Sequence, residues 1–163
     1  MHIEERPGAC MIVYNPETNC VYMGQRSDTK KWCFAGGKQE ECDQGDTYNT
    51  ALRELREEFG FVFDEDVKSY SLGSCIVPGF KRFKHDNAKD TFESTFYKTA
   101  VYLAVTQKEF HHIAIDGEMD KVVKINLDDI FMQLGDELSP STMIVANIAT
   151  SYINNFFKKK GSK

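Results

Sequence analysis

The segment that most constrains the fold is residues 47–59, which has the pattern of one amphipathic helix ending at a glycine. Its apolar side chains recur at positions i, i+3, i+4, i+7 and i+11, which is the spacing of a single helical stripe: Tyr48, Ala51, Leu52, Leu55 and Phe59. Asp46 or Thr47 can cap the N-terminus, and Gly60 stands where a C-capping glycine belongs. A helix with one apolar stripe must bury that stripe against another layer of structure.

The same helix carries three carboxylates away from its apolar stripe. At 100° per residue, Glu54, Glu57 and Glu58 share one arc of about 100°. Like charges at this spacing cost the helix a few tenths of a kcal/mol per pair. A hard divalent cation would offset that cost, because magnesium prefers oxygen ligands and also takes substrate phosphates. The alternative for an isolated pattern of this kind is a solvated acidic face, partly neutralised by Arg53 and Arg56.

The segments around the helix indicate strands on both sides of it. Apolar or alternating runs predict strands, the first two joined as a hairpin by turn residues: 9–14, 20–25, 32–35, 71–77, 95–105 and 122–127. A polar connection with a basic cluster is expected over 78–94. A short helix is expected at 128–134, and a last helix begins at Ser139-Pro140 and runs to about 159. This order predicts an α/β fold, a mixed sandwich rather than a repeating βαβ pattern.

Length and charge exclude several classes of protein. A chain of 163 residues fits a single domain over 1–163. Its net charge of -5 disfavours a general attraction to nucleic acid. Five cysteines without a CxxC pair disfavour a zinc site and suit free thiols in a reducing compartment. The sequence has no apolar run long enough for a membrane span and starts with a charged segment rather than a signal peptide, so a cytoplasmic location is expected.

The helix and its surroundings resemble the Nudix signature, GX5EX7REUXEEXGU, where U is an apolar residue. Residues 53–61 match the second half of this signature at every specified position. The residues upstream of the signature are also similar to those that usually precede it in the family: Gln25-Arg26, Trp32, Gly36-Gly37-Lys38 and Glu40. The resemblance therefore covers at least residues 9–130. It implies a Nudix-like α/β/α sandwich with a mixed sheet.

The first half of the signature departs from the family pattern. Gly37 lies 16 residues before Arg53, whereas the family spacing is 14, and the position expected for the motif glutamate holds Gly45. Asp46 is the nearest substitute by this count, and we expect it to pair with Arg53. Ala35 also replaces the common proline before the two glycines.

The resemblance implies a hydrolase that cuts a pyrophosphate bond in a nucleoside diphosphate-linked or nucleoside polyphosphate substrate by metal-activated water. It makes Glu57 and Glu58 the main ligands of Mg²⁺, for which Mn²⁺ is a substitute. Glu54 then completes the metal cluster or orients the water, and a backbone carbonyl of Gly36 or Gly37 is a further ligand. Arg53 orients a glutamate in this scheme. A second carboxylate from a later loop is expected at Glu118, with Asp116 and Asp120 as the next candidates.

The sequence offers two groups of substrate-binding candidates. Arg26, Trp32 and Phe34 lie near the expected cleft, although a core position for Trp32 is an equal alternative. Lys81 and Arg82 belong to the cluster 80–85, which mixes cations with aromatics and suits phosphate or RNA binding, or else is an ordinary exposed loop.

The expected partner is a small nucleotide-like substrate, with an RNA 5′ end as a further candidate, and the chain is a monomer or a homodimer. The main rival interpretation is a catalytically inactive Nudix-fold module that binds nucleotide or RNA. Such a module would usually have lost a helix carboxylate, and this chain keeps all three.

Overall fold

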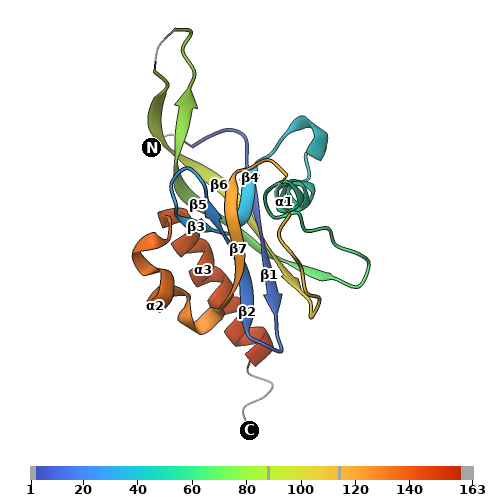
Figure 1. Ribbon diagram of the computed structural model, residues 1–163. Helices are drawn as coiled ribbons and strands as arrows, with labels where there is room; N and C mark the ends of the chain where they lie inside the picture. Colours follow the sequence, from blue (N-terminus) through green and yellow to red (C-terminus); the bar gives the residue numbers. More distant parts are fainter. Residues whose placement is uncertain (1–2, 88, 114, 159–163) are drawn as a thin grey trace.

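The computed structural model describes residues 3–87, 89–113 and 115–158, with the side chain of Arg82 outside that description. A twisted sheet carries helix α1 on one face and α2 and α3 on the other (Figure 1). The strands are β1 (Gly8–Asn15), β2 (Cys20–Arg26), β3 (Trp32–Cys33), β4 (Ala35–Lys38), β5 (Lys68–Phe83), β6 (Thr91–Val105) and β7 (Met119–Asn126). The helical segments are η1 (Glu41–Asp43), α1 (Thr47–Glu54), η2 (Leu55–Phe59), η3 (Leu127–Asp129), α2 (Ile130–Leu134), η4 (Gly135–Glu137), α3 (Pro140–Ile153) and η5 (Asn154–Lys158).

Strand β1 is the centre of the sheet. One of its edges pairs in parallel with β6, and the other is shared by β4 and β2, both antiparallel. The order is β3-β2-β1-β6-β5, with β7 beside β2. Every residue of β1 is buried, which explains why this strand is a continuous apolar run. The expected α/β/α sandwich with a mixed sheet is therefore confirmed.

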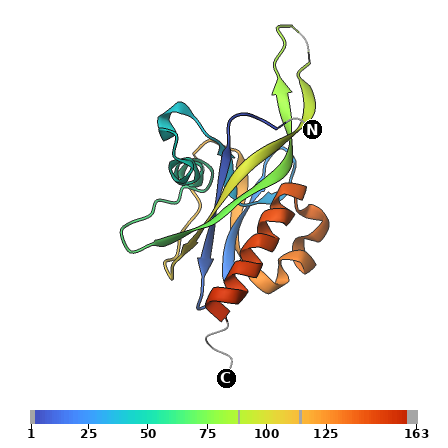
Figure 2. The ribbon, with the colours of Figure 1, turned by 180° about the vertical axis from the view of Figure 1, so that it is seen from behind.

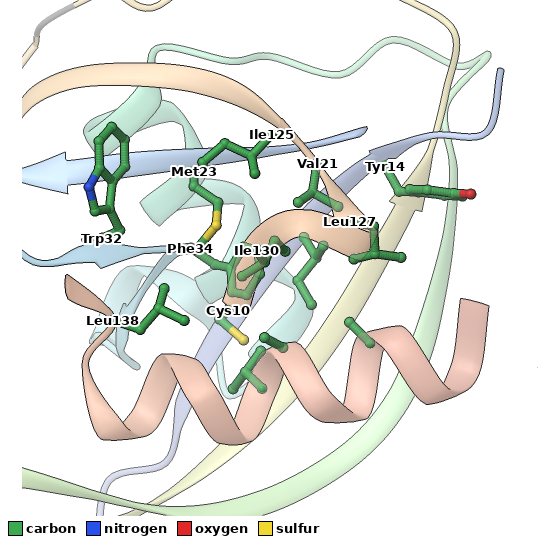
Figure 3. Packing of buried hydrophobic residues seen from close by; sticks show 14 of the residues in the cluster. Cys10, Tyr14, Val21, Met23, Trp32, Phe34, Ile125, Leu127, Ile130 and Leu138 are labelled. Carbon is green, nitrogen blue, oxygen red and sulfur yellow. The ribbon is translucent and has the colours of Figure 1, made fainter. Parts of the chain in front are cut away.

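Alternate residues of β1 supply two separate cores. Ala9, Met11 and Val13 face α1 and pack with Ala51, Leu55 and Phe59, the apolar stripe expected from the sequence. Cys10, Ile12 and Tyr14 face α3 and pack with Val145, Ala146 and Ala149 (Figure 3). The period of two in a strand thus divides one apolar run between two layers. In the described residues, no helix combines the length and apolar character needed to cross a bilayer.

Most predicted elements are confirmed, and one is wrong. The connection expected over 78–94 is instead the outer part of a long hairpin, in which β5 and β6 pair from Lys68↔Val105 to Phe83↔Thr91. This β5–β6 hairpin projects well beyond the rest of the molecule (Figures 1 and 2). The polar and basic residues of the segment suggested a loop, but only residues 84–90 connect the two strands. The flanking residues pair through their backbones, and this pairing does not depend on side-chain polarity.

The carboxylate helix begins and ends as the sequence predicts. The Asp46 side chain accepts a hydrogen bond from the Tyr48 N–H and is the N-cap. The α-helical turns of α1 widen into a π-helical turn, η2, and Gly60 ends the helix at φ 76°. A π-helical turn within a helix often marks a functional site, and this one contains Glu57 and Glu58.

Gly60 should tolerate no side chain, for two separate reasons. Its positive φ disfavours any L-residue by about 1–2 kcal/mol, and a Cβ would lie 2.7 Å from the Ile113 carbonyl oxygen. Gly45 has the same φ, but a Cβ there meets nothing within 4 Å. We therefore expect Gly60→Ala to lower the free energy of unfolding by roughly 2–4 kcal/mol and Gly45→Ala by only about 1 kcal/mol. Urea unfolding measures both, and equal losses would contradict the close contact with Ile113.

Candidate active site

Two glycines of β4 allow the carboxylate helix to lie directly against the sheet. A Cβ on Gly37 would come within 2.3 Å of Glu54 Oε1, so any side chain there would displace the Glu54 carboxylate. The N–H of Gly36 donates to Glu58 Oε1 at 2.8 Å. The Gly36-Gly37 pair therefore has a physical function: it brings the β4 backbone into contact with the helix carboxylates.

Burial raises the pKa of two of these carboxyl groups. Glu58 is 2% exposed, and loss of solvation raises its pKa to about 8, although the Gly36 N–H opposes the shift. Loss of solvation also raises the pKa of Glu54 to about 7, against the opposing charge and hydrogen bond of Arg53. Charges on neighbouring carboxylates add to both shifts, including that of Glu118. The structure thus holds two acids where their charged forms are poorly solvated.

Arg53 is the main cation of the cluster, and its side chain is only 9% exposed. Its Nη1 donates to Glu54 Oε1 at 2.9 Å and to Glu57 Oε2 at 3.1 Å. Its Nη2 donates to the Lys38 carbonyl at 2.9 Å. One guanidinium therefore positions two helix carboxylates and ties them to the end of β4.

The partner that orients Arg53 is Asp43, and the expectation of Asp46 is wrong. Asp43 accepts from Arg53 Nε at 3.0 Å and from Nη2 at 3.1 Å, a two-point pair. Asp46 serves as the helix N-cap instead. The sequence did contain the evidence, because counting forward from Gly37 places Asp43 after the five residues that the signature specifies. The extra residues lie after this acid rather than before it.

Asp43 is itself firmly held. It is buried, and its Oδ2 accepts from the Glu40 N–H and the Thr50 hydroxyl, both at 2.9 Å. The hydrogen bond from Arg53 is the largest of the effects that lower its pKa to about 2. This pair fixes the loop before the helix onto the helix itself.

Glu118 lies immediately before β7. Its side chain is exposed, and Oε2 is 4.0 Å from Arg26 Nη1. Arg26 is anchored by Asp28, which accepts from its Nε at 2.9 Å and its Nη2 at 3.0 Å. The Ser27 N–H donates to the Glu118 carbonyl at 2.9 Å, so the end of β2 holds this loop in place. Arg26 and Glu118 are therefore brought to the same side as Glu54 and Glu58, whose pKa values Glu118 influences.

The two fallback acids have other contacts. Asp116 Oδ1 accepts from the Glu118 N–H at 3.0 Å, and Asp120 pairs with Lys30 at 2.5 Å. Asp116 thus shapes the turn that presents Glu118, while Asp120 belongs to a surface ion pair.

The aromatic candidates lie in the core. Trp32 and Phe34 are each 6% exposed and pack in the cluster on the α3 side (Figure 3). The Trp32 Nε1–H donates to Glu137 Oε2 at 3.0 Å. The core position that the sequence left open for Trp32 is therefore confirmed, and burial leaves neither ring free to stack on a base in this conformation.

Lys81 is not brought to the carboxylates. Lys81 lies on the β5–β6 hairpin and pairs with Glu4 at 3.2 Å. The side chain of Arg82 lies outside the described part of the structure.

The donor set suits a hard divalent cation, although it is not gathered into a cage. Among the described residues, no three side chains of His, Cys, Asp or Glu form a metal-binding group, because Arg53 bridges Glu54 and Glu57. Glu57 is 39% exposed and meets Arg53 through one oxygen, so it can turn toward a cation. Oxygen ligands of this kind, with poorly compensated charge at Glu58, fit magnesium or manganese.

Comparisons with known proteins agree on one family. The family model described as NUDIX domain matches residues 4–144. Comparison of the sequence with curated proteins gives no match.

Three solved structures illustrate the similarity. The Nudix domain of Shewanella oneidensis NrtR, complexed with ADP ribose, has 18% identity and a TM-score of 0.67, over 92% of this chain and 89% of that one. An Ap4A hydrolase from C. elegans has 13% identity and a TM-score of 0.60, over 93% and 99%. The dihydroneopterin triphosphate pyrophosphohydrolase of E. coli has 17% identity and a TM-score of 0.61, over 98% and 99%. At these identities the likeness concerns the fold.

The Asp43–Arg53 pair should contribute to stability in a pH-dependent way. We expect Asp43→Asn to lower the free energy of unfolding at pH 7 by about 2 kcal/mol. Because its pKa is lowered from 3.8 to about 2 in the folded chain, this contribution is complete above about pH 5 and is lost progressively as the pH falls to about 1. Unfolding curves of wild type and variant over this pH range measure it.

Asp46→Asn is the matched control for that measurement. Asparagine caps a helix about as well as aspartate, so this variant should stay within about 0.5 kcal/mol of wild type. A loss for Asp46→Asn as large as that for Asp43→Asn would return the pairing role to Asp46.

Proposed function

This chain belongs to the Nudix family, and from that premise we propose that it is a magnesium-dependent hydrolase that cuts a pyrophosphate bond in a nucleotide-like substrate. The observation that carries the proposal is the carboxylate cluster itself. Glu58 is buried and Glu54 half-buried against β4, and both have raised pKa values. This arrangement costs stability unless a cation is bound there.

Each residue of the cluster has a proposed part. Glu57 and Glu58 hold the cation, Glu54 completes the set, and the backbone carbonyl of Gly37 is a further ligand. When bound, magnesium would neutralise the polyphosphate and make water a better nucleophile at neutral pH; manganese prefers the same ligands. Arg53 keeps Glu54 and Glu57 oriented through its hydrogen bonds, while Asp43 keeps Arg53 in place.

Glu118 is the proposed base or orienting acceptor for the attacking water. It faces the helix carboxylates from another element of the fold, and as an exposed carboxylate beside Arg26 it is open to solvent. Arg26 is the proposed contact for a substrate phosphate, because its guanidinium is fixed by Asp28 and lies next to the acidic cluster. Neither role needs a covalent intermediate.

The substrate class is nucleoside diphosphate-linked compounds or nucleoside polyphosphates. The similar structures are described by their complex with ADP ribose or as hydrolases of Ap4A and of dihydroneopterin triphosphate. These three compounds all contain phosphoanhydride bonds. A panel of such compounds, assayed with magnesium, with manganese and with a chelator, identifies the best substrate. Hydrolysis in ¹⁸O-labelled water then shows which phosphorus is attacked. Magnesium-independent binding with no turnover of any panel member would instead support a non-catalytic binding module.

Loss of a metal ligand should abolish turnover without unfolding the chain. We expect Glu57→Gln and Glu58→Gln each to reduce kcat by at least ~100-fold, because charge stabilisation through the metal is lost. At position 58 glutamine keeps an acceptor for the Gly36 N–H and resembles the protonated acid, so stability should change little.

Glu17→Gln is the matched control, because Glu17 is an exposed carboxylate in the β1–β2 turn. It should retain wild-type kcat and magnesium affinity. Near wild-type turnover of both the Glu57→Gln and the Glu58→Gln variants would remove the central claim.

Glu118→Gln should separate water activation from metal binding. A positioned base supplies about 10²–10⁴-fold in rate, so kcat should fall by at least ~100-fold. Magnesium affinity should fall much less than in Glu57→Gln, and the low-pH limb of the rate profile should change. Asp120→Asn, which only breaks the pair with Lys30, is the control. If Glu118→Gln keeps full kcat and an unchanged pH profile, the base lies elsewhere.

A further inference from the structure

We propose that the β5–β6 hairpin binds single-stranded RNA, so that the bond cut at the carboxylate cluster is the one carried at an RNA 5′ end. This inference rests on the proposed function for the reaction, but the binding surface is argued independently. The chemical reason for RNA is that a chain begun from a nucleoside triphosphate keeps its phosphoanhydride bonds at the 5′ end.

The register places one face of the hairpin on the same side of the sheet as the catalytic helix. Ala100, Tyr102 and Ala104 of β6 belong to the cluster that packs against α1. Side chains alternate along a strand, so positions 98, 96, 94 and 92 continue this α1-facing row outward. Their partners across the hairpin are Ile76, Pro78, Phe80 and Arg82.

This α1-facing row exposes aromatic rings far from the core. Phe80 is 69% exposed and Phe92 is 63% exposed, and Ile76 is also exposed nearer the base. From Ala100 to Phe92 the row extends about 26 Å, at ~3.3 Å per residue. Exposed ring faces spaced along a groove or ribbon are suited to stacking with successive bases.

The opposite face of the hairpin is engaged with the body of the protein. Lys81 pairs with Glu4 at 3.2 Å, and Lys38 Nζ lies 4.8 Å from the centre of the Tyr97 ring. The Tyr97 hydroxyl donates to the Phe80 carbonyl at 3.1 Å. The contacts of Lys81 and Tyr97 join the hairpin to the N-terminal segment and to β4, and they leave the α1-facing row for a ligand.

The base of the hairpin and the carboxylate cluster both contact Lys38 of β4. Lys38 closes β4, and its carbonyl accepts from Arg53 Nη2 at 2.9 Å. Lys98, which is exposed, occupies the α1-facing row one step beyond Ala100. A ligand that places its phosphoanhydride at Glu54 and Glu58 and extends along the hairpin would therefore meet first Lys98 and then the rings of Phe80 and Phe92.

Charge favours a polyanion over a second copy of the chain. Residues 78–98 contain five lysines and arginines against three aspartates and glutamates, whereas the whole chain has a net charge of -5. Two positively charged hairpins would repel one another, whereas a phosphate backbone is attracted to each. Cations interleaved with exposed aromatics are the combination that single-stranded nucleic acid binders use.

The test is fluorescence anisotropy with a labelled single-stranded RNA of about 10 nucleotides, within the ~4–16 nucleotides that one nucleic-acid-binding fold covers. The RNA has a 5′ hydroxyl, so binding does not depend on hydrolysis. We expect the double variant Phe80→Ala, Phe92→Ala to raise Kd at least ~10-fold, and wild-type affinity to fall with increasing salt. Met132→Ala, at an 87% exposed position of α2, is the control and should bind as wild type.

A second measurement distinguishes failure of this inference from failure of the proposed function. The double variant should hydrolyse the best mononucleotide substrate at the wild-type rate but show a raised KM for 5′-triphosphorylated RNA. If no compound is hydrolysed, the proposed function fails, but the anisotropy measurement still tests whether the hairpin binds RNA. Equal affinity of wild type and double variant, equal binding of single-stranded DNA or of duplex RNA, or a change from dimer to monomer in the double variant would each overturn the RNA proposal.

Discussion

The two-point pair between Arg53 and Asp43 is the interaction on which the geometry of the site depends. Arg53 contacts the loop before the helix through Asp43, the end of β4 through the Lys38 carbonyl, and its own helix through Glu54 and Glu57. Because the pair is buried, removing one partner leaves an uncompensated charge, which is strongly destabilising. The same contacts that stabilise the fold therefore fix the carboxylates relative to Gly36 and Gly37.

Periodicity predicted the parts of the fold in which one side of an element is buried. The apolar stripe of residues 47–59 predicted the helix and its buried face. Asp46 and Gly60 predicted its two ends, because the unpaired backbone groups at a helix terminus need local capping residues. The central strand β1 followed from its continuous apolar run, and Ser139-Pro140 marked the start of α3. The three carboxylates on one arc followed from helix geometry alone, because a helical period fixes which side chains share a face.

Other features depended on contacts that the sequence pattern does not specify. Asp43 was missed because the position of the acid was counted back from Arg53, across a loop whose length differs from the family spacing, rather than forward from Gly37. Trp32 and Phe34 are buried because the region around α3 covers that face of the sheet, as the bridge between Trp32 and Leu138 illustrates. This burial arises from tertiary packing, which a local sequence pattern does not specify. The outer part of the β5–β6 hairpin was missed because strand pairing there is a backbone interaction, and no buried face gives its side chains an alternating pattern.

The loss of solvation at Glu54 and Glu58 destabilises the chain when no cation is bound. Both acids have raised pKa values because they have lost solvation, and Glu58 receives one backbone hydrogen bond from Gly36. Apolar residues at these positions would pack against β4 without a desolvation penalty, and replacing buried charges in this way is often neutral or stabilising. Gly36 and Gly37 add to the cost, since glycine loses more backbone entropy on folding than any other residue. Stability alone therefore does not account for two acids placed against two glycines, whereas the proposed site for a cation and a pyrophosphate would account for all four residues together.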